Sequence, residues 1–290
     1  MNLSGKTVRF REAFNPPTPE YPDLQFDYRE NELRLTSDLT MAREVQQQLL
    51  HRESRDVPGI DLATACVPAR ELGGDFYDLL PYGSGCLALA LGDVSGKGTA
   101  AALLSALAIG ILRAQTVDHA ASPPEVLAAL NNYIHGARLD ARFVVMHFGV
   151  LDQRTRRLTL ANAGNPYPLM LRKARVDEIT VSGIPLGLIE GTQYDSVSLD
   201  LQRGDVIVLA SDGILECRNE EQEAFGRRRL AKVLTSLPQE TLAENICSAI
   251  LGATNEFSGH ASAPDDDRAL LVLRVSDDPR ADFSTLPLFY

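Results

Sequence analysis

The chain of 290 residues lacks any long apolar run. Its longest run, from Ala100 to Leu112, covers about 13 residues and is interrupted by Ser105 and Gly110, whereas a bilayer span needs roughly 20. The N-terminus also lacks the basic stretch and apolar core of a secretion signal. These absences predict a cytoplasmic protein without a membrane span.

Cysteine is scarce, and no two cysteines form a CxxC pair. This excludes the ligand spacing of a zinc knuckle and that of a thioredoxin-type centre. Scattered thiols in a chain of this size fit a reducing compartment. The four cysteines are Cys66, Cys86, Cys217 and Cys247.

Positive charge is also in short supply. Lysine and arginine total 28 against 39 aspartates and glutamates, which gives a net charge of −11. An acidic surface repels phosphate backbones and anionic lipids, so no nucleic-acid partner is expected. Hydrophobic residues make up 44% and charged residues 23%, as in a globular protein with a sizeable core.

The composition along the chain predicts four segments. Residues 1–30 are rich in proline and form a disordered tail, and residues 277–290 form a C-terminal tail. Residues 31–57 contain an amphipathic helix over 31–51, which either packs on its own domain or dimerises and receives a signal. Residues 58–276 form the globular domain. The apolar stripe of the helix consists of Leu35, Leu39, Ala42, Val45 and Leu49.

The globular segment mixes strand patterns with a few helix patterns, which predicts an α+β fold rather than a repeating βαβ array. Helices are expected over 98–115, 123–137 and 239–256. Strands are expected over 60–67, 86–92, 143–151, 157–162, 167–172, 205–210 and 269–275.

Aspartates recur where the predicted strands end or begin. Asp93 follows the strand 86–92, Asp212 follows the strand 205–210, and an Asp triplet over 265–267 precedes the last strand. Asp75 lies in a further glycine-rich turn. Half-buried carboxylates repel one another and coexist best around divalent cations such as Mg²⁺ or Mn²⁺, which prefer oxygen ligands. Each motif alone is most often a turn or a solvated loop, but four together favour a metal site.

The ordered series of motifs resembles the bacterial PPM-type serine/threonine phosphatases of the SpoIIE/RsbU family, relatives of the PP2C phosphatases. The resemblance runs from about Ala42 to Val275. Its fragments are 42–50 (AREVQQQLL), 68–78 (PARELGGDFYD), 92–98 (GDVSGKG), 161–166 (ANAGNP), 183–187 (GIPLG), 211–216 (SDGILE), 225–226 (FG) and 266–267 (DD).

This resemblance implies a PP2C-like α-β-β-α sandwich preceded by the N-terminal linker helix, with two Mn²⁺ or Mg²⁺ ions at one edge. It makes Asp93 the carboxylate that bridges both ions. Val94 would offer its backbone carbonyl to one ion, and Asp75 would bind on that side. Asp212 and Asp266 would hold the other ion.

Asp267 would support Asp266 at the same site, with the register within 265–267 left open by one residue. The implied activity is hydrolysis of phosphoserine or phosphothreonine on a regulatory protein, a STAS-type anti-sigma-factor antagonist, by attack of a metal-bridged hydroxide. An upstream activator acting on the 31–51 helix and a homodimer are possible partners. The alternatives are a catalytically silent PPM-fold binding module in a partner-switching pathway and a metallohydrolase of small phosphate esters.

Four positions depart from the usual family pattern. The family often has His where Asn165 stands, Thr where Val145 and Ala269 stand, and His as well as Lys at position 97. None of these is a carboxylate ligand, so activity is expected to survive, with effects on rate and substrate fit. Lys97 either contacts phosphate or is a solvated loop lysine.

Overall fold

The computed structural model describes residues 22–50, 57–116, 121–138, 142–259 and 264–276, with the backbone alone described over 22–29. The chain divides into two units, residues 1–40 and 41–290. Helix α1 (Pro22–Leu50) belongs to the first unit up to Thr40 and to the second from Met41. No helix in the described part of the chain is long and apolar enough to cross a membrane.

The second unit contains two antiparallel five-stranded sheets. In each sheet, some adjacent strands follow one another in the sequence and others are far apart in it. In order across the first sheet lie β2 (Phe76–Pro81), β3 (Cys86–Val94), β4 (Val144–Asp152), β5 (Arg157–Ala163) and β8 (Ser196–Asp200). In order across the second lie β1 (Ile60–Val67), β10 (Arg268–Val275), β9 (Val206–Ala210), β6 (Leu169–Arg172) and β7 (Arg175–Glu178).

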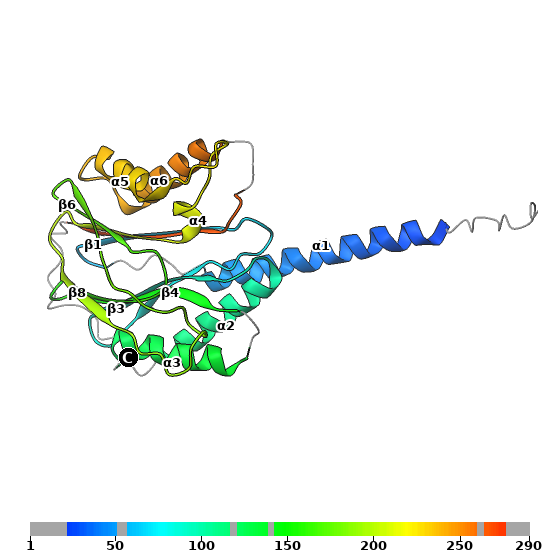
Figure 1. Ribbon diagram of the computed structural model, residues 1–290, viewed down its shortest axis with the longest axis horizontal. Helices are drawn as coiled ribbons and strands as arrows, with labels where there is room; N and C mark the ends of the chain where they lie inside the picture. The colour runs from blue at the N-terminus through cyan, green and yellow to red at the C-terminus, as the bar shows by residue number, and fades with distance from the viewer. Residues whose placement is uncertain (1–21, 51–56, 117–120, 139–141, 260–263, 277–290) are drawn as a thin grey trace, which may run out of the picture. The chain divides into compact units, whose positions relative to one another are not determined.

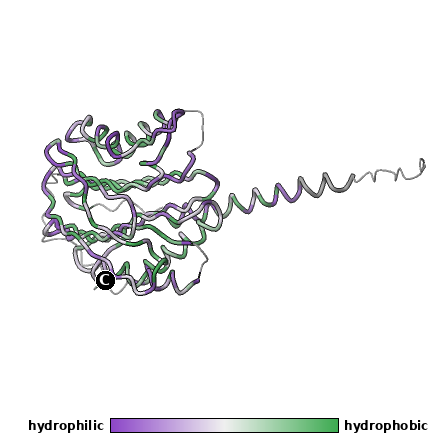
Figure 2. Tube along the Cα trace, in the orientation of Figure 1, coloured by the Kyte–Doolittle hydropathy of each residue, from purple (hydrophilic) through white to green (hydrophobic). Residues whose placement is uncertain are grey.

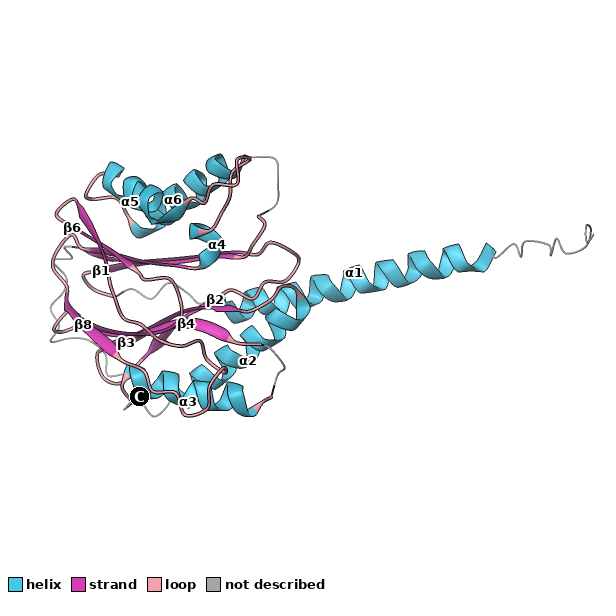
Figure 3. Ribbon diagram, viewed as in Figure 1, coloured by secondary structure: helices cyan, strands magenta, loops and turns pink. Residues whose placement is uncertain are grey.

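Helices cover the outer face of each sheet, so this unit has four layers (Figures 1 and 3). Helices α2 (Thr99–Gln115) and α3 (Pro123–Gly136) pack on the β2–β8 sheet. Helices α5 (Gly226–Ser236) and α6 (Ala243–Ser258), with the short α4 (Asp212–Leu215), pack on the other sheet.

Because successive side chains of a strand point to opposite faces of the sheet, one apolar strand contributes to two hydrophobic cores. In β3, Leu87, Leu89 and Leu91 point into the core between the sheets, while Ala88 and Ala90 point toward α2 and α3. Successive side chains of a strand face opposite sides, and the small alanines leave room for helices on one side. The hydrophobic segments of Figure 2 follow these buried strands.

The structure confirms the α+β sandwich and each predicted strand. The elements that the sequence analysis did not predict are β2, β7, β8, α4 and α5. Helix α1 begins at Pro22 rather than at 31, so residues 22–30 are helical and not part of an extended tail. A proline is well tolerated in the first turn of a helix, which explains how a proline-rich segment can open one. Residues 1–21 of the expected tail and 277–290 lie outside the described residues.

Candidate metal centre

Antiparallel pairing between β2 and β3 brings the first two acidic motifs together. Phe76, the first residue of β2, lies opposite Gly92 near the end of β3. Asp75 directly precedes Phe76, and Asp93 directly follows Gly92. The start of one strand and the end of its neighbour therefore place the two carboxylates at the same edge of the sheet.

The same geometry operates in the second sheet. Ala210 at the end of β9 pairs with Leu270 near the start of β10. Asp212 follows β9, and Asp266 and Asp267 precede β10, so these carboxylates share one end of that sheet.

Asp267 joins the two groups of acidic residues. Its side chain is buried, and its Oδ1 accepts the Ala69 N–H at 2.7 Å while its Oδ2 accepts the Gly74 N–H at 2.6 Å. Both amides belong to the loop that leads to Asp75. The carboxylate of Asp267 therefore links the loop before β2, which carries Asp75, to the start of β10 in the other sheet.

Asp75 is the most unusual carboxylate of this edge. It is only 1% exposed, and neither of its oxygens has a hydrogen-bond partner among the described residues. Burial, followed by the charge of Asp93, raises the pKa of Asp75 well above its ordinary value; Ser211 lies near enough to oppose the shift. A buried carboxylate that makes no hydrogen bond of good geometry is stabilised by a proton or a cation.

The neighbouring aspartates feel one another in the same way. Burial and then the charge of Asp212 raise the pKa of Asp93, and burial and then the charge of Asp266 raise the pKa of Asp212. The aspartates of the four predicted acidic segments therefore lie close enough for the charge of one to change the pKa of the next.

The donor set fits a hard divalent cation. It offers carboxylate and carbonyl oxygens and no nitrogen or sulfur ligand, the preference of Mg²⁺ and Mn²⁺. Within the described residues, no group of three or more His, Cys, Asp or Glu side chains is placed so that it could hold a metal ion together. Mg²⁺ usually keeps several waters and binds through one or two carboxylates, so its binding does not require three such side chains.

Two glycines are required by close approach at this edge. A Cβ on Gly74 would lie 3.0 Å from the carbonyl oxygen of Val94, so glycine keeps that oxygen accessible. A Cβ on Gly213 would lie 1.9 Å from the carbonyl oxygen of Asp267, which no side chain permits. Glycine here lets α4 approach the backbone that carries the acidic pair.

Gln46 is a functional candidate that the sequence analysis missed. Its Nε2 donates to the Gly73 carbonyl at 2.7 Å, and the Gly73 N–H donates back to its Oε1 at 3.3 Å. The last turns of α1 therefore hold the loop that positions Asp75. The only sequence signal is a glutamine on the half-buried side of the helix, which by itself indicates no partner.

The side chain of Lys97 contacts the acidic segment before β10. Its Nζ lies 3.0 Å from Oδ1 of Asp266 and also donates to the Asp265 carbonyl. It is therefore not a freely solvated lysine, and its contact with phosphate stays a prediction.

Three of the positions that depart from the family pattern lie in or beside the strands that carry the clustered aspartates. Asn165 is buried, and its Nδ2 contacts the Leu91 carbonyl and Nδ1 of His147, 3.1 Å away. Val145 lies opposite Asp93 in the sheet, and Ala269 donates its N–H to Ser211. His147 is fully buried.

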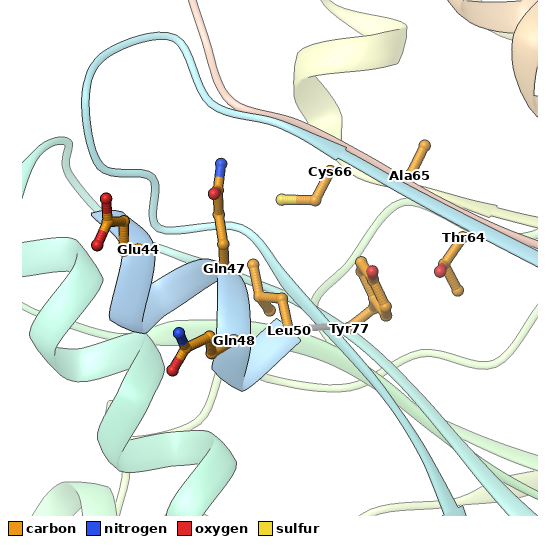
Figure 4. A pocket seen from close by; sticks show the side chains of 8 residues that line it. All are labelled: Glu44, Gln47, Gln48, Leu50, Thr64, Ala65, Cys66 and Tyr77. Atoms are coloured by element: carbon orange, nitrogen blue, oxygen red, sulfur yellow. The ribbon is translucent and has the colours of Figure 1, made fainter. Parts of the chain in front are cut away.

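A pocket of about 510 Å³ lies beside this edge, between the end of α1 and strands β1 and β2 (Figure 4). None of the clustered aspartates lines it. Cys66 does, and its Sγ donates to the Asp75 carbonyl at 3.5 Å. The other lining residues are Glu44, Gln47, Gln48, Leu50, Thr64, Ala65 and Tyr77.

Solved structures define the class of protein to which this sandwich belongs. The PP2C domain of SiaA from Pseudomonas aeruginosa matches with a TM-score of 0.74 at 22% identity, over 84% of this chain and 98% of that one. The RsbU and RsbW domains of Rv1364c from Mycobacterium tuberculosis match with a TM-score of 0.66 at 28% identity, over 77% and 62%. The fold is that of the PP2C phosphatases.

Sequence comparison narrows the class to a family. The family model of Stage II sporulation protein E (SpoIIE) matches residues 83–276. Phosphoserine phosphatase RsbU of Bacillus subtilis is 27% identical over 245 residues, 83% of this chain and 70% of RsbU. Protein IcfG of Synechocystis is 26% identical over 226 residues, but the match covers only 36% of IcfG. The chain belongs to the SpoIIE family of PPM-type protein serine/threonine phosphatases.

Proposed function

We propose that this phosphatase uses two divalent ions, Mn²⁺ or Mg²⁺, held by Asp75, Asp93, Asp212 and Asp266, to hydrolyse phosphoserine or phosphothreonine on a regulatory protein. The observation that carries the proposal is the buried carboxylate of Asp75, neither of whose oxygens makes a hydrogen bond within the described residues. Such a group is costly in a metal-free fold and is well suited to a cation.

The position of each residue suggests its role. Asp93 lies between Asp75 and Asp212 in the series of electrostatic contacts, which suits a ligand shared by two ions. The carbonyl of Val94, kept open by Gly74, suits an additional oxygen ligand. Asp267 already accepts two backbone amides, so it would orient the Asp75 loop rather than supply most of the metal coordination.

The edge also explains why cations are needed for this substrate. A phosphate monoester is an anion, and an edge of clustered carboxylates would repel it. Bound divalent ions would neutralise the phosphoryl oxygens and lower the pKa of a water molecule that attacks phosphorus. Burial raises the pKa of Cys66, and that of Cys247 to about 12, so neither thiol is a ready nucleophile. This favours direct attack by water without a phospho-enzyme.

The proposed protein substrate is a STAS-type anti-sigma-factor antagonist in a partner-switching pathway. Two curated relatives, RsbU and RsbP, carry the name phosphoserine phosphatase, and a structural neighbour combines RsbU and RsbW domains in one chain. These names support a phosphorylated regulatory protein as substrate.

The proposed route of regulation is the helix α1. Its last turns contact the Asp75 loop through Gln46 and accept a hydrogen bond from Arg113 at the Leu49 carbonyl, 2.7 Å away. Dimerisation, or an upstream activator that shifts this helix, would therefore change the position of Asp75.

The decisive experiment measures Mn²⁺-dependent hydrolysis of p-nitrophenyl phosphate and of a phosphoserine protein, with and without chelator. Asp93→Asn should abolish both activities, because it removes the shared carboxylate. Asp195→Asn is the matched control, since Asp195 is exposed and carries the same charge change. Full activity of Asp93→Asn would refute the metal assignment, and activity on the small ester alone would refute the protein substrate.

A further inference from the structure

The loop between β3 and α2 places a lysine against the proposed metal edge. Lys97 stands between Gly96 and Gly98, which have φ values of 96° and 74° and therefore adopt a backbone that few other residues tolerate. The base of the loop is fixed, because the Ser95 N–H donates to the Phe143 carbonyl and the Phe143 N–H donates to Ser95 Oγ. The loop therefore delivers the ammonium group to a defined position.

At that position the ammonium group faces carboxylates of the second sheet. Its Nζ is 3.0 Å from Oδ1 of Asp266. Its charge also acts on Asp212, in the direction that favours the ionised form. Two arginines also lie near this loop: Arg142 donates to the Ser95 carbonyl, and the guanidinium of Arg70 lies close to Gly98.

We propose that Lys97 is a tethered counter-cation, which neutralises Asp266 while the site is free of metal and competes with a divalent ion for that carboxylate. The inference rests on the proposed metal site and adds a determinant of its affinity. Lys97 would stabilise the metal-free fold and, for the same reason, weaken metal binding on the Asp212 and Asp266 side.

The geometry allows the exchange that this role requires. The side chains of Lys97 and Asp266 are 37% and 46% exposed, so the lysine can withdraw into solvent on its flexible stem. If the ammonium group of Lys97 stays near the divalent ion, the two positive charges repel each other. If it moves away, its ion pair with Asp266 is lost. Either way, metal binding loses some free energy to the presence of Lys97.

The test compares Lys97→Met with the wild-type chain by calorimetric titration of the metal-free protein with Mn²⁺. We expect the dissociation constant of the weaker ion to fall by about two- to fivefold, the range of a partly exposed ion pair. In chelator, the melting temperature of Lys97→Met should fall by about 1–3 °C. Lys232→Met is the control, because Lys232 is exposed on α5 and its loss changes the net charge equally.

Lys97→Arg keeps the charge and should leave the affinity near that of the wild type. Unchanged or weaker Mn²⁺ binding by Lys97→Met would overturn the inference, as would an equal gain in Lys232→Met. A raised KM for phosphoprotein with unchanged Mn²⁺ affinity would instead make Lys97 a phosphate contact. If the wild type binds no Mn²⁺, the proposed function itself fails, together with this inference.

Discussion

The contact between Gln46 and Gly73 gives the sharpest prediction. The amide of this side chain makes two hydrogen bonds to the backbone of one residue, at 2.7 and 3.3 Å. Gly73 precedes Gly74 and Asp75, so the contact connects α1 to the proposed metal ligand. Gln46→Ala removes both bonds and leaves the backbone of Gly73 to find other partners.

The magnitude follows from the hydrogen bonds that are lost. Each contributes about 0.5–1.5 kcal/mol, so the variant should lose about 1–3 kcal/mol of unfolding free energy. For a domain of this size, about 2 kcal/mol corresponds to roughly 4–8 °C in melting temperature. Because part of the loss falls on the loop that carries Asp75, the Mn²⁺ concentration for half-maximal activity should rise as well.

Thermal unfolding in chelator and Mn²⁺ activation curves measure the two effects separately. The control is Gln48→Ala, on the same turn of α1, where the side chain lines the pocket of Figure 4. We expect it to change stability by less than about 0.5 kcal/mol. Equal stability and equal Mn²⁺ activation in the two variants would refute the idea that α1 positions the metal loop through Gln46.

Three further predictions concern the supporting structure. Arg113→Met removes an ion pair of 2.6 Å to the buried carboxylate of Asp78 and should cost about 3–5 kcal/mol in chemical denaturation, with a smaller loss contradicting the pairing. Gly213→Ala should cost about 3 kcal/mol, whereas Gly252→Ala, which meets open space in α6, should be neutral or stabilising. Burial lowers the pKa of His147 to about 3, so below pH 6.5 the unfolded state binds the proton that the folded state rejects. Stability should then fall by about 1.4 kcal/mol per pH unit as pH drops from 6.5 toward 3. The raised pKa values of the clustered aspartates change stability in the opposite direction. The assay therefore compares the pH dependence of urea denaturation between the wild type and His147→Gln. Parallel pH profiles would contradict the lowered pKa of His147.

Local patterns were sufficient for much of the fold. Strand β1 has the predicted bounds, and the predicted helices α2 and α3 agree within a residue at each end, because hydrophobic periodicity is a property of the segment itself. Apart from β2, the elements that were not predicted are short or polar. Strand β8 (Ser196–Asp200) alternates between exposed and half-buried residues, and α4 has only four residues, so neither carries a strong apolar signal.

The α+β class, the family resemblance and the positions of the aspartates at strand ends could be predicted from the amino-acid sequence alone. Tertiary structure decided which polar groups meet: Asp267 with Ala69 and Gly74, 198 and 193 positions away, Gln46 with Gly73, and Lys97 with Asp266. The physical reason is that apolar spacing is read within one segment, whereas a hydrogen bond between distant residues exists only after two sheets and a helix have packed.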